Sequence, residues 1–161
     1  MAYQGYMRIT GKLQGLISAG CGSQASIGNK CQAGHGDEIM VLSFNHSLSN
    51  PINAIRTTHH PVMVTKLVDK ASPLLGQAVD GREVVDCDIH FYRTHPAGHR
   101  EKYFSVRLED ALIVAQDIDV PHAVLMTDQE TEERLYIRYR TISWIHHAAG
   151  TSGHASWGEQ S

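Results

Sequence analysis

Residues 135–157 read LYIRYRTISWIHHAAGTSGHASW, and this stretch decides the fold of the chain. Its first half, residues 135–145, is rich in aromatic and β-branched side chains and holds neither Gly nor Pro, which predicts one long β-strand. One face is apolar from Leu135 onward, whereas the other begins with two arginines and becomes apolar at Ile142 and Trp144. We therefore expect a strand that is solvated on one face at its start. At its end we expect cover on both faces, from the core or from another subunit.

A turn and a short tail follow this strand. Small residues, AGTSG, occupy positions 149–153 and predict the turn that ends the strand. Trp157 then lies in a small polar tail, so that Trp144 and Trp157, the only two tryptophans, bracket the turn. The simplest interpretation is one tryptophan in the core and a second that anchors the C-terminal segment.

Most of the remaining chain also has the pattern of β-strands. The clearest period-two signal comes from four apolar residues that alternate with polar ones, Val85, Cys87, Ile89 and Phe91. Further strands are predicted at Tyr6–Leu13, Glu38–Asn45, Pro61–Val68, Glu101–Leu108 and Ala111–Ala115. We expect Leu13 to face inward and the strand 38–45 to be covered on both faces, because it is almost continuously apolar. Residues 14–36 predict short strands joined by turns, one of them at 25–27, and residues 117–133 predict an acidic connection.

One helix is predicted, over residues 69–81. Ser72 suits the N-cap, Pro73 suits the first helical position, and Gly81 is a C-terminal stop signal. The apolar residues of one face are Leu74, Leu75, Ala78 and Val79. About eight strands and one helix predict a mainly β fold. We expect a compact antiparallel β-barrel of two packed sheets with one short flanking α-helix, in a single domain spanning residues 1–161.

Composition excludes several classes of protein. With 42% hydrophobic and 19% charged residues the chain has an ordinary globular composition, not a disordered one. A formal charge of −3 argues against nucleic-acid binding, because phosphate recognition needs concentrated Lys and Arg. There is no apolar run long enough to span a membrane and no secretory signal pattern at the N-terminus. Three cysteines without CxxC spacing indicate free thiols in a reducing compartment, although the spacing also allows a Cys21–Cys31 disulfide.

Eleven histidines invite a metal hypothesis that their spacing does not support. Neighbours on a strand point to opposite faces, so the adjacent pairs His59–His60 and His146–His147 are poorly placed to share an ion. Asp88 and His90 share a strand face and form the best local pair, without a visible third ligand. The sequence therefore predicts no metal site and no cofactor.

Catalytic patterns are weaker still. Asp86 and Asp88 lie two apart on an outward face, where acidic residues are normally solvated. The chain contains no GxSxG, no phosphate-binding loop and no GxGxxG, and the GTSG sequence at 150–153 is explained by a turn. We therefore expect a protein that is not an enzyme.

Long apolar strands in an open barrel need covered edges, which favours a closed homo-oligomer.

Short motifs occur along nearly the whole chain in a specific order. They are KLQG at 12–15, GHGDEI at 34–39, HHP at 59–61, KASPLL at 70–75, FYR at 91–93, YFS at 103–105, and the C-terminal Tyr139–Arg140, Ile142, Trp144, AGTSG at 149–153 and Trp157. In this order and spacing the sequence resembles the haemolysin-coregulated protein family, Hcp, the tube subunit of bacterial type VI secretion systems.

The resemblance implies a β-barrel that assembles as a homohexameric ring. Such rings stack into a tube inside a contractile sheath, with spike and baseplate proteins as partners, and some members of the family carry secreted effector proteins in the lumen as their chaperones. The protein is then first cytoplasmic and later secreted through the type VI apparatus without a signal peptide, with no nucleic-acid partner and no membrane insertion. Because the chain stops four residues after Trp157, we expect no fused toxin domain.

Two contact regions between subunits are expected. The connection 46–60 is longer than usual, and long ordered loops are often functional or interfacial. Together with the turn after the long strand it supplies the candidate interface residues His46, Asn50, His59, His60, Trp144, Thr151 and Trp157. If His59 and His60 lie at a rim, protonation near about pH 6 should loosen ring stacking. A monomeric peptide-binding β-barrel and a His-rich metal-binding protein stay open as alternatives.

Overall fold

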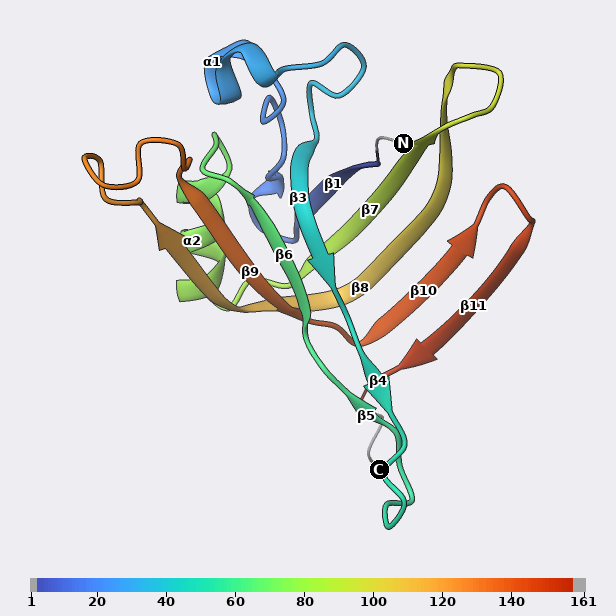
Figure 1. Ribbon diagram of the computed structural model, residues 1–161. Helices are drawn as coiled ribbons and strands as arrows, with labels where there is room; N and C mark the ends of the chain where they lie inside the picture. The colour runs from blue at the N-terminus through green and yellow to red at the C-terminus, as the bar shows by residue number, and fades with distance from the viewer. Residues whose placement is uncertain (1–2, 158–161) are drawn as a thin grey trace.

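The computed structural model describes residues 3–157, and its fold is mainly β, as predicted. The strands are β1 Gln4–Gly11, β2 Gly15–Leu16, β3 Ile39–Asn45, β4 Leu48–Ser49, β5 Thr58–His59, β6 Val62–Leu67, β7 Val85–Thr94, β8 Arg100–Asp119, β9 Glu132–Arg138, β10 Thr141–His146 and β11 Thr151–Ser156 (Figure 1). The helices are α1 Gln24–Ile27, a 3-10 turn at Gly28–Lys30, and α2 Ser72–Asp80. Neither α1 nor α2 has the length and apolar character needed to cross a lipid bilayer.

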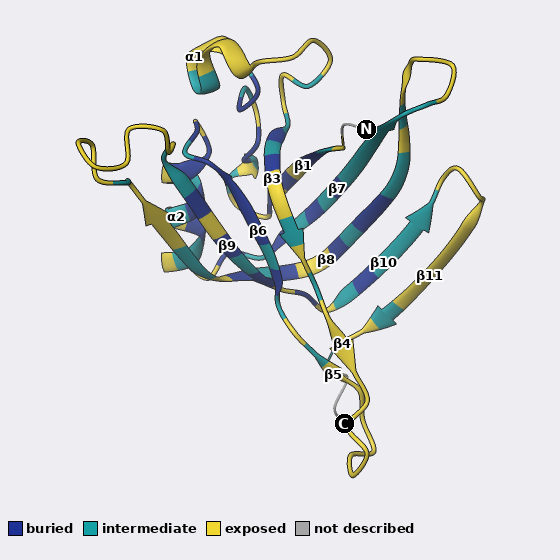
Figure 2. Cartoon of the chain, viewed as in Figure 1, coloured by how far each residue is buried: buried dark blue, intermediate teal, exposed yellow. Residues whose placement is uncertain are grey.

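Six strands close into a barrel around one core. They pair antiparallel in the order β8–β7–β1–β3–β6–β9, and β9 pairs again with β8, which completes the ring. The 20-residue strand β8 makes the closure possible, because its first half pairs with β7 and its second half with β9. Buried residues concentrate on these strands and on the inner side of α2 (Figure 2).

The expected single strand over residues 135–145 is wrong, because the chain bends at Tyr139–Arg140 and forms β9 and β10. Leu135, Ile137 and Tyr139 are buried before the bend, whereas Ile142 is buried after it, so the inward face changes from odd to even positions. The strand β8, which pairs with both β9 and β10, bends at the same level. A β-bulge there leaves Asp110 with φ of 49°. Two paired strands thus change direction together.

At this bend the sheet divides. β9 continues to β6 and closes the barrel, whereas β10 leaves it and pairs with β11 (Figure 1). The predicted turn at 149–153 is therefore wrong in position: the turn precedes Thr151, and residues 151–156 are the strand β11. The predicted tail is thus a strand up to Ser156. Most of β11 is exposed.

The predicted helix is confirmed with one correction. Pro73 lies in its first turn and Gly81 ends it, but the N-cap is Ala71. Ser72 does not cap the helix because its hydroxyl turns into a buried polar network. The short strand expected at 25–27 is instead part of helix α1.

Two burial expectations fail. Leu13 lies beyond the end of β1 and is 85% exposed. Strand β3 is buried only at Ile39 and Val41, whereas Leu42 is 45% exposed. The connection after β3 also has structure of its own, since β4 and β5 pair into a narrow ribbon that extends away from the barrel (Figure 1). Residues 46–60 therefore form a projecting ribbon, not an irregular loop.

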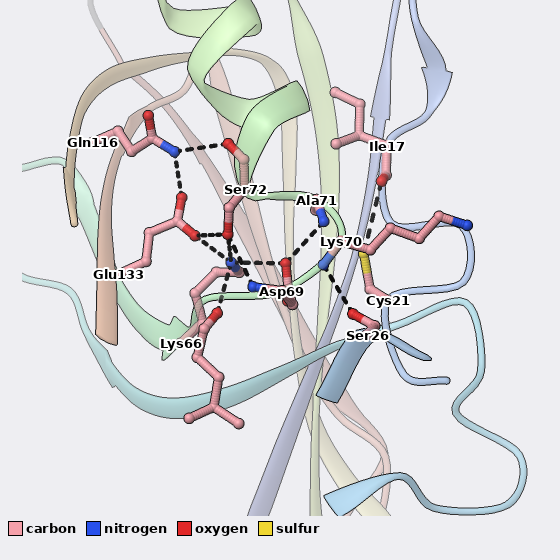
Figure 3. Close-up of polar contacts among 11 residues, drawn as sticks. Ile17, Cys21, Ser26, Lys66, Asp69, Lys70, Ala71, Ser72, Gln116 and Glu133 are labelled. Atoms are coloured by element: carbon pink, nitrogen blue, oxygen red, sulfur yellow. Dashed lines mark hydrogen bonds and ion pairs between the residues drawn. The ribbon is translucent and has the colours of Figure 1, made fainter. Parts of the chain in front are cut away.

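A buried ionic network joins the closing strands to the helix (Figure 3). The Lys66 ammonium of β6 contacts the Glu133 carboxylate of β9 and lies 3.0 Å from Asp69 Oδ1, and the side chains of Lys66 and Glu133 are 0% exposed. The Ser72 hydroxyl donates to Glu133 Oε1 at 2.6 Å, and the Gln116 amide of β8 donates to Glu133 Oε2. Burial raises the pKa of Asp69, although the nearby ammonium of Lys66 opposes that change.

We predict that Lys66→Ala destabilises the fold strongly. The substitution leaves the carboxylates of Glu133 and Asp69 buried without their cation, which should lower the free energy of unfolding by about 3–5 kcal/mol. Urea denaturation at fixed protein concentration measures this. Lys30→Ala is the matched control, because it removes an exposed ion pair with Glu130 at 2.7 Å and should change stability by less than about 1 kcal/mol. Equal losses in the two variants would contradict the structural role of the network.

Candidate functional site

A buried tyrosine at the bend between β9 and β10 joins two histidines from distant parts of the chain. The Tyr139 hydroxyl lies 2.8 Å from His46 Nε2 and 2.8 Å from His59 Nδ1. His46 follows directly after β3, and His59 belongs to β5, so both lie where the ribbon leaves the barrel. Tyr139 itself is 1% exposed. The Tyr139 hydroxyl therefore holds both segments at the base of the ribbon, one through His46 and one through His59, against the barrel.

Aromatic contacts extend this cluster to the β10–β11 hairpin. The rings of His59 and Trp157 stack with centroids 5.8 Å apart at 18°, and Trp157 meets Tyr139 edge to face at 5.1 Å. The ring centroids of Trp144 and His46 are 6.3 Å apart. The guanidinium of Arg138 covers the Trp157 ring at 4.9 Å, an arrangement suited to a cation–π interaction. Both tryptophans therefore pack against the cluster, and Trp157 attaches the end of β11 to it.

The structure brings four of the seven candidate interface residues together around Tyr139: His46, His59, Trp144 and Trp157. Of the other three, Asn50 and Thr151 lie elsewhere on the ribbon and on β11, whereas His60 directly follows His59 and acts on the pKa of His46. Asn50 is on the ribbon and accepts a hydrogen bond from Thr57 Oγ1 at 2.9 Å. The backbone NH of His60 donates to Ser47 O at 3.3 Å, and Thr151 begins β11.

The candidate set omitted Tyr139, the residue that organises the cluster. Tyr139 lies 93 residues from His46 and 80 from His59, so no local spacing could signal the contact. The one signal in the sequence is an aromatic residue directly before Arg140 in an alternating run, and a continuous strand explains that pattern equally well.

Burial keeps the groups of the cluster neutral. Burial lowers the pKa of His46, with His59 and His60 adding to the effect, and it also lowers the pKa of His59. It raises the pKa of Tyr139 to about 12. A neutral phenol can donate to one imidazole and accept from the other, so both hydrogen bonds require at least one imidazole to be unprotonated. The cluster is therefore a set of neutral groups whose hydrogen bonds attach the ribbon to the barrel.

The ribbon carries apolar side chains that the chain itself does not cover. Ile52 and Ile55, at its far end, are 100% and 98% exposed. An apolar hollow with a volume of about 370 Å³ lies on the barrel, between β1, β3, β7 and β8. Phe44, Phe91 and Phe104 are among the residues that line it. Exposed apolar groups on a projection and an apolar hollow on the body are features of contact surfaces.

The carboxylate and histidine pairs considered from the sequence are engaged in the strand ladder. Asp88 accepts from Arg107 at 2.7 and 2.8 Å, and His90 Nδ1 lies 2.8 Å from Ser105 Oγ. Asp86 accepts from the backbone NH of Asp110 at 3.0 Å. The Asp88–His90 pair is therefore not arranged around a common ion.

The three cysteines are free thiols, so the Cys21–Cys31 disulfide that the spacing allowed does not form. Cys21 and Cys87 are buried, and Cys31 is exposed. Burial raises the pKa of Cys21 to about 12, which makes this thiol a weak nucleophile.

Comparison with known proteins yields one family. A family model described as "Type VI secretion system effector, Hcp" matches residues 6–146. The "Major exported protein" of Pseudomonas aeruginosa is 40% identical over 98% of this chain and 96% of its own length. The structure titled "Crystal structure of Hcp protein" has a TM-score of 0.92 at 34% identity and covers 98% of this chain and 99% of that one. The "Secreted protein Hcp3 from Pseudomonas aeruginosa" has a TM-score of 0.87 at 41% identity, with 98% and 100% covered.

We predict that the cluster loses stability in acid. His46 and His59 have folded-state pKa values below the ordinary 6.5, so the unfolded chain binds protons more readily. Their contribution is complete above pH 6.5 and is lost as the pH falls from there through the folded-state values. Urea unfolding at pH 7.5 and 5.5 should show this loss. The double variant His46→Gln with His59→Gln should depend less on pH, and an unchanged dependence would contradict the assignment.

Proposed function

Because the chain belongs to the Hcp family of type VI secretion proteins, we propose that it is a structural subunit of the secretion tube. The family match, which spans residues 6–146, is the observation that carries the proposal. In this proposal six copies close into a ring, and rings stack into a tube inside a contractile sheath with a spike and baseplate at its end. Such a subunit works by shape and needs no bond-making chemistry.

The exposed hairpin supports lateral contacts between copies. β11 is the last strand in the sheet order, and its outer edge has no strand beside it among residues 3–157. An unpaired strand edge tends to recruit another chain, and repeated contact of one edge with a different surface closes a ring when the rotation fits. We assign Trp144, Thr151 and Trp157 to this lateral region, where the tryptophans hold the hairpin in place.

The ribbon suits a contact with another ring. Its apolar end projects from the barrel, and its base is fixed by the Tyr139 hydroxyl. We assign His46, Asn50, His59 and His60 to this region, with Ile52 and Ile55 as the apolar contact itself. The adjoining histidines would make stacking sensitive to acid.

Export follows from the same proposal. The subunit would be made in the cytoplasm and expelled as part of the tube, with secreted effector proteins carried in the lumen. The relative described as a "Major exported protein" supports this route. The apolar hollow on β1, β3, β7 and β8 keeps a second function in view, a monomeric barrel that binds an apolar peptide segment.

We predict that the purified protein forms a closed ring. Light scattering should give a mass of about six times the 17.8 kDa subunit, and negative-stain microscopy should show annular particles. A single subunit's mass at every concentration from micromolar upward, without annular particles, would contradict the tube proposal. That outcome would favour the peptide-binding barrel.

We predict that acidic side chains at the end of the ribbon prevent stacking without unfolding the subunit. Ile52→Asp with Ile55→Asp should leave rings intact and abolish tubes, because a charge at an apolar contact remains unpaired. Tube length by microscopy is the measurement. Val124→Asp with Leu125→Asp is the matched control, because these residues are also exposed, at 77% and 75%, but lie on the β8–β9 connection. Normal tubes in the ribbon variant would refute this assignment.

A further inference from the structure

The turn between β7 and β8 places two histidine rings face to face. His95 donates its backbone NH to His99 O at 2.7 Å, and Gly98 donates to His95 O at 2.8 Å, so the turn is closed by its own backbone. Gly98 has φ of 97°, a conformation that favours glycine. The rings of His95 and His99 stack with centroids 4.4 Å apart at 15°.

A carboxylate completes the group. Glu101, the second residue of β8, lies two residues after His99, and its Oε2 is 3.7 Å from His95 Nε2. Arg93, its partner across the ladder, donates to Oε1 at 2.8 Å. The guanidinium therefore orients the carboxylate and leaves Oε2 facing the histidines. Ligating carboxylates in metal sites are commonly held by such an outer hydrogen bond.

The three potential ligand atoms lie within 4.8 Å of one another. Two imidazole nitrogens and one carboxylate oxygen are ligands that Zn²⁺ prefers, at about 2.0–2.2 Å from the ion. Ligand atoms around one tetrahedral ion are therefore roughly 3.3 Å apart, which follows from those bond lengths. The side chains are half-buried or exposed. Binding one ion requires rotation about their own bonds that brings the ligand atoms closer and turns the two stacked rings toward a common point. Among residues 3–157 this is the one such group of three.

We propose that His95, His99 and Glu101 form a binding site for a transition-metal dication such as Zn²⁺, with a fourth coordination position open to water. His95 Nδ1 accepts a hydrogen bond from the backbone NH of Ala97 at 3.0 Å. Binding through Nε2 places the proton on Nδ1 and exchanges that hydrogen bond for the metal bond. The inference does not depend on the tube proposal, because the site lies within one hairpin.

Calorimetric titration of the untagged, metal-free protein with Zn²⁺ tests the site, and Co²⁺ absorption reports its geometry. We expect one ion per subunit and tetrahedral Co²⁺ bands. His99→Gln and Glu101→Gln should each weaken binding by at least about tenfold, since even outer-shell partners contribute that much. Circular dichroism of the metal-free variants should match the parent, because these residues lie at the tip of a hairpin.

His122→Gln is the matched control, because it removes an exposed histidine from the β8–β9 connection. Its Zn²⁺ affinity should equal that of the parent. Absence of saturable binding by the parent overturns the proposal. So does unchanged affinity in both the His99 and Glu101 variants, since binding would then come from other histidines.

Discussion

The closed barrel depends on the buried ion pairs of the Lys66 ammonium with Glu133 and Asp69. A lone charge in the interior is strongly unfavourable, so the fold is compatible with Lys66 only when Glu133 and Asp69 lie beside it. Those partners come from β9 and from the segment before α2, and Ser72 and Gln116 complete their hydrogen bonds. The network therefore holds β6, β8, β9 and α2 in one arrangement. The same charges penalise alternative packings that leave any member unpaired.

The second constraint is the shared bend of β8 and the β9–β10 segment. Because Asp110 and Arg140 lie at the same level on neighbouring strands, both strands change their inward face together. One half of the divided sheet closes the barrel, and the other half projects as the β10–β11 hairpin. The bend also directs Tyr139 toward the base of the ribbon. Closure of the core, the departure of the β10–β11 hairpin and the contact of Tyr139 with the ribbon thus meet at one bend.

This division separates the buried core from two exposed projections. The barrel interior is filled by the chain's own apolar side chains, whereas the ribbon end and the outer edge of β11 remain exposed. The Tyr139 cluster connects the two projections through His59 and Trp157, so that both are attached to the core. In the proposed tube, such a subunit would present preformed contact surfaces before it meets another copy. The rigidity comes from hydrogen bonds and stacked rings at the base of the projections.

The sequence alone determined the elements whose signals are local. Alternation from Val85 to Phe91 identifies β7, and Pro73 and Gly81 bound the helix to within a residue or two. The order of short motifs along the chain indicated the family, and the family match over residues 6–146 confirms it. Four members of the candidate interface, among them His46 and Trp157, proved to share one cluster, although nothing in the sequence indicated which residue joins them.

Only the tertiary structure decided the remaining features, because each depends on partners that are distant in sequence. Ser72 has the side chain of an N-cap, yet the buried Glu133, 61 residues away, competes successfully for its hydroxyl. The strand break at Tyr139 cannot be read from residues 135–145, because its cause includes the bulge at Asp110 on the neighbouring strand. Side-chain periodicity fixes the faces of a strand only while the backbone stays regular. Where two strands bend together, three-dimensional pairing determines which residues face inward.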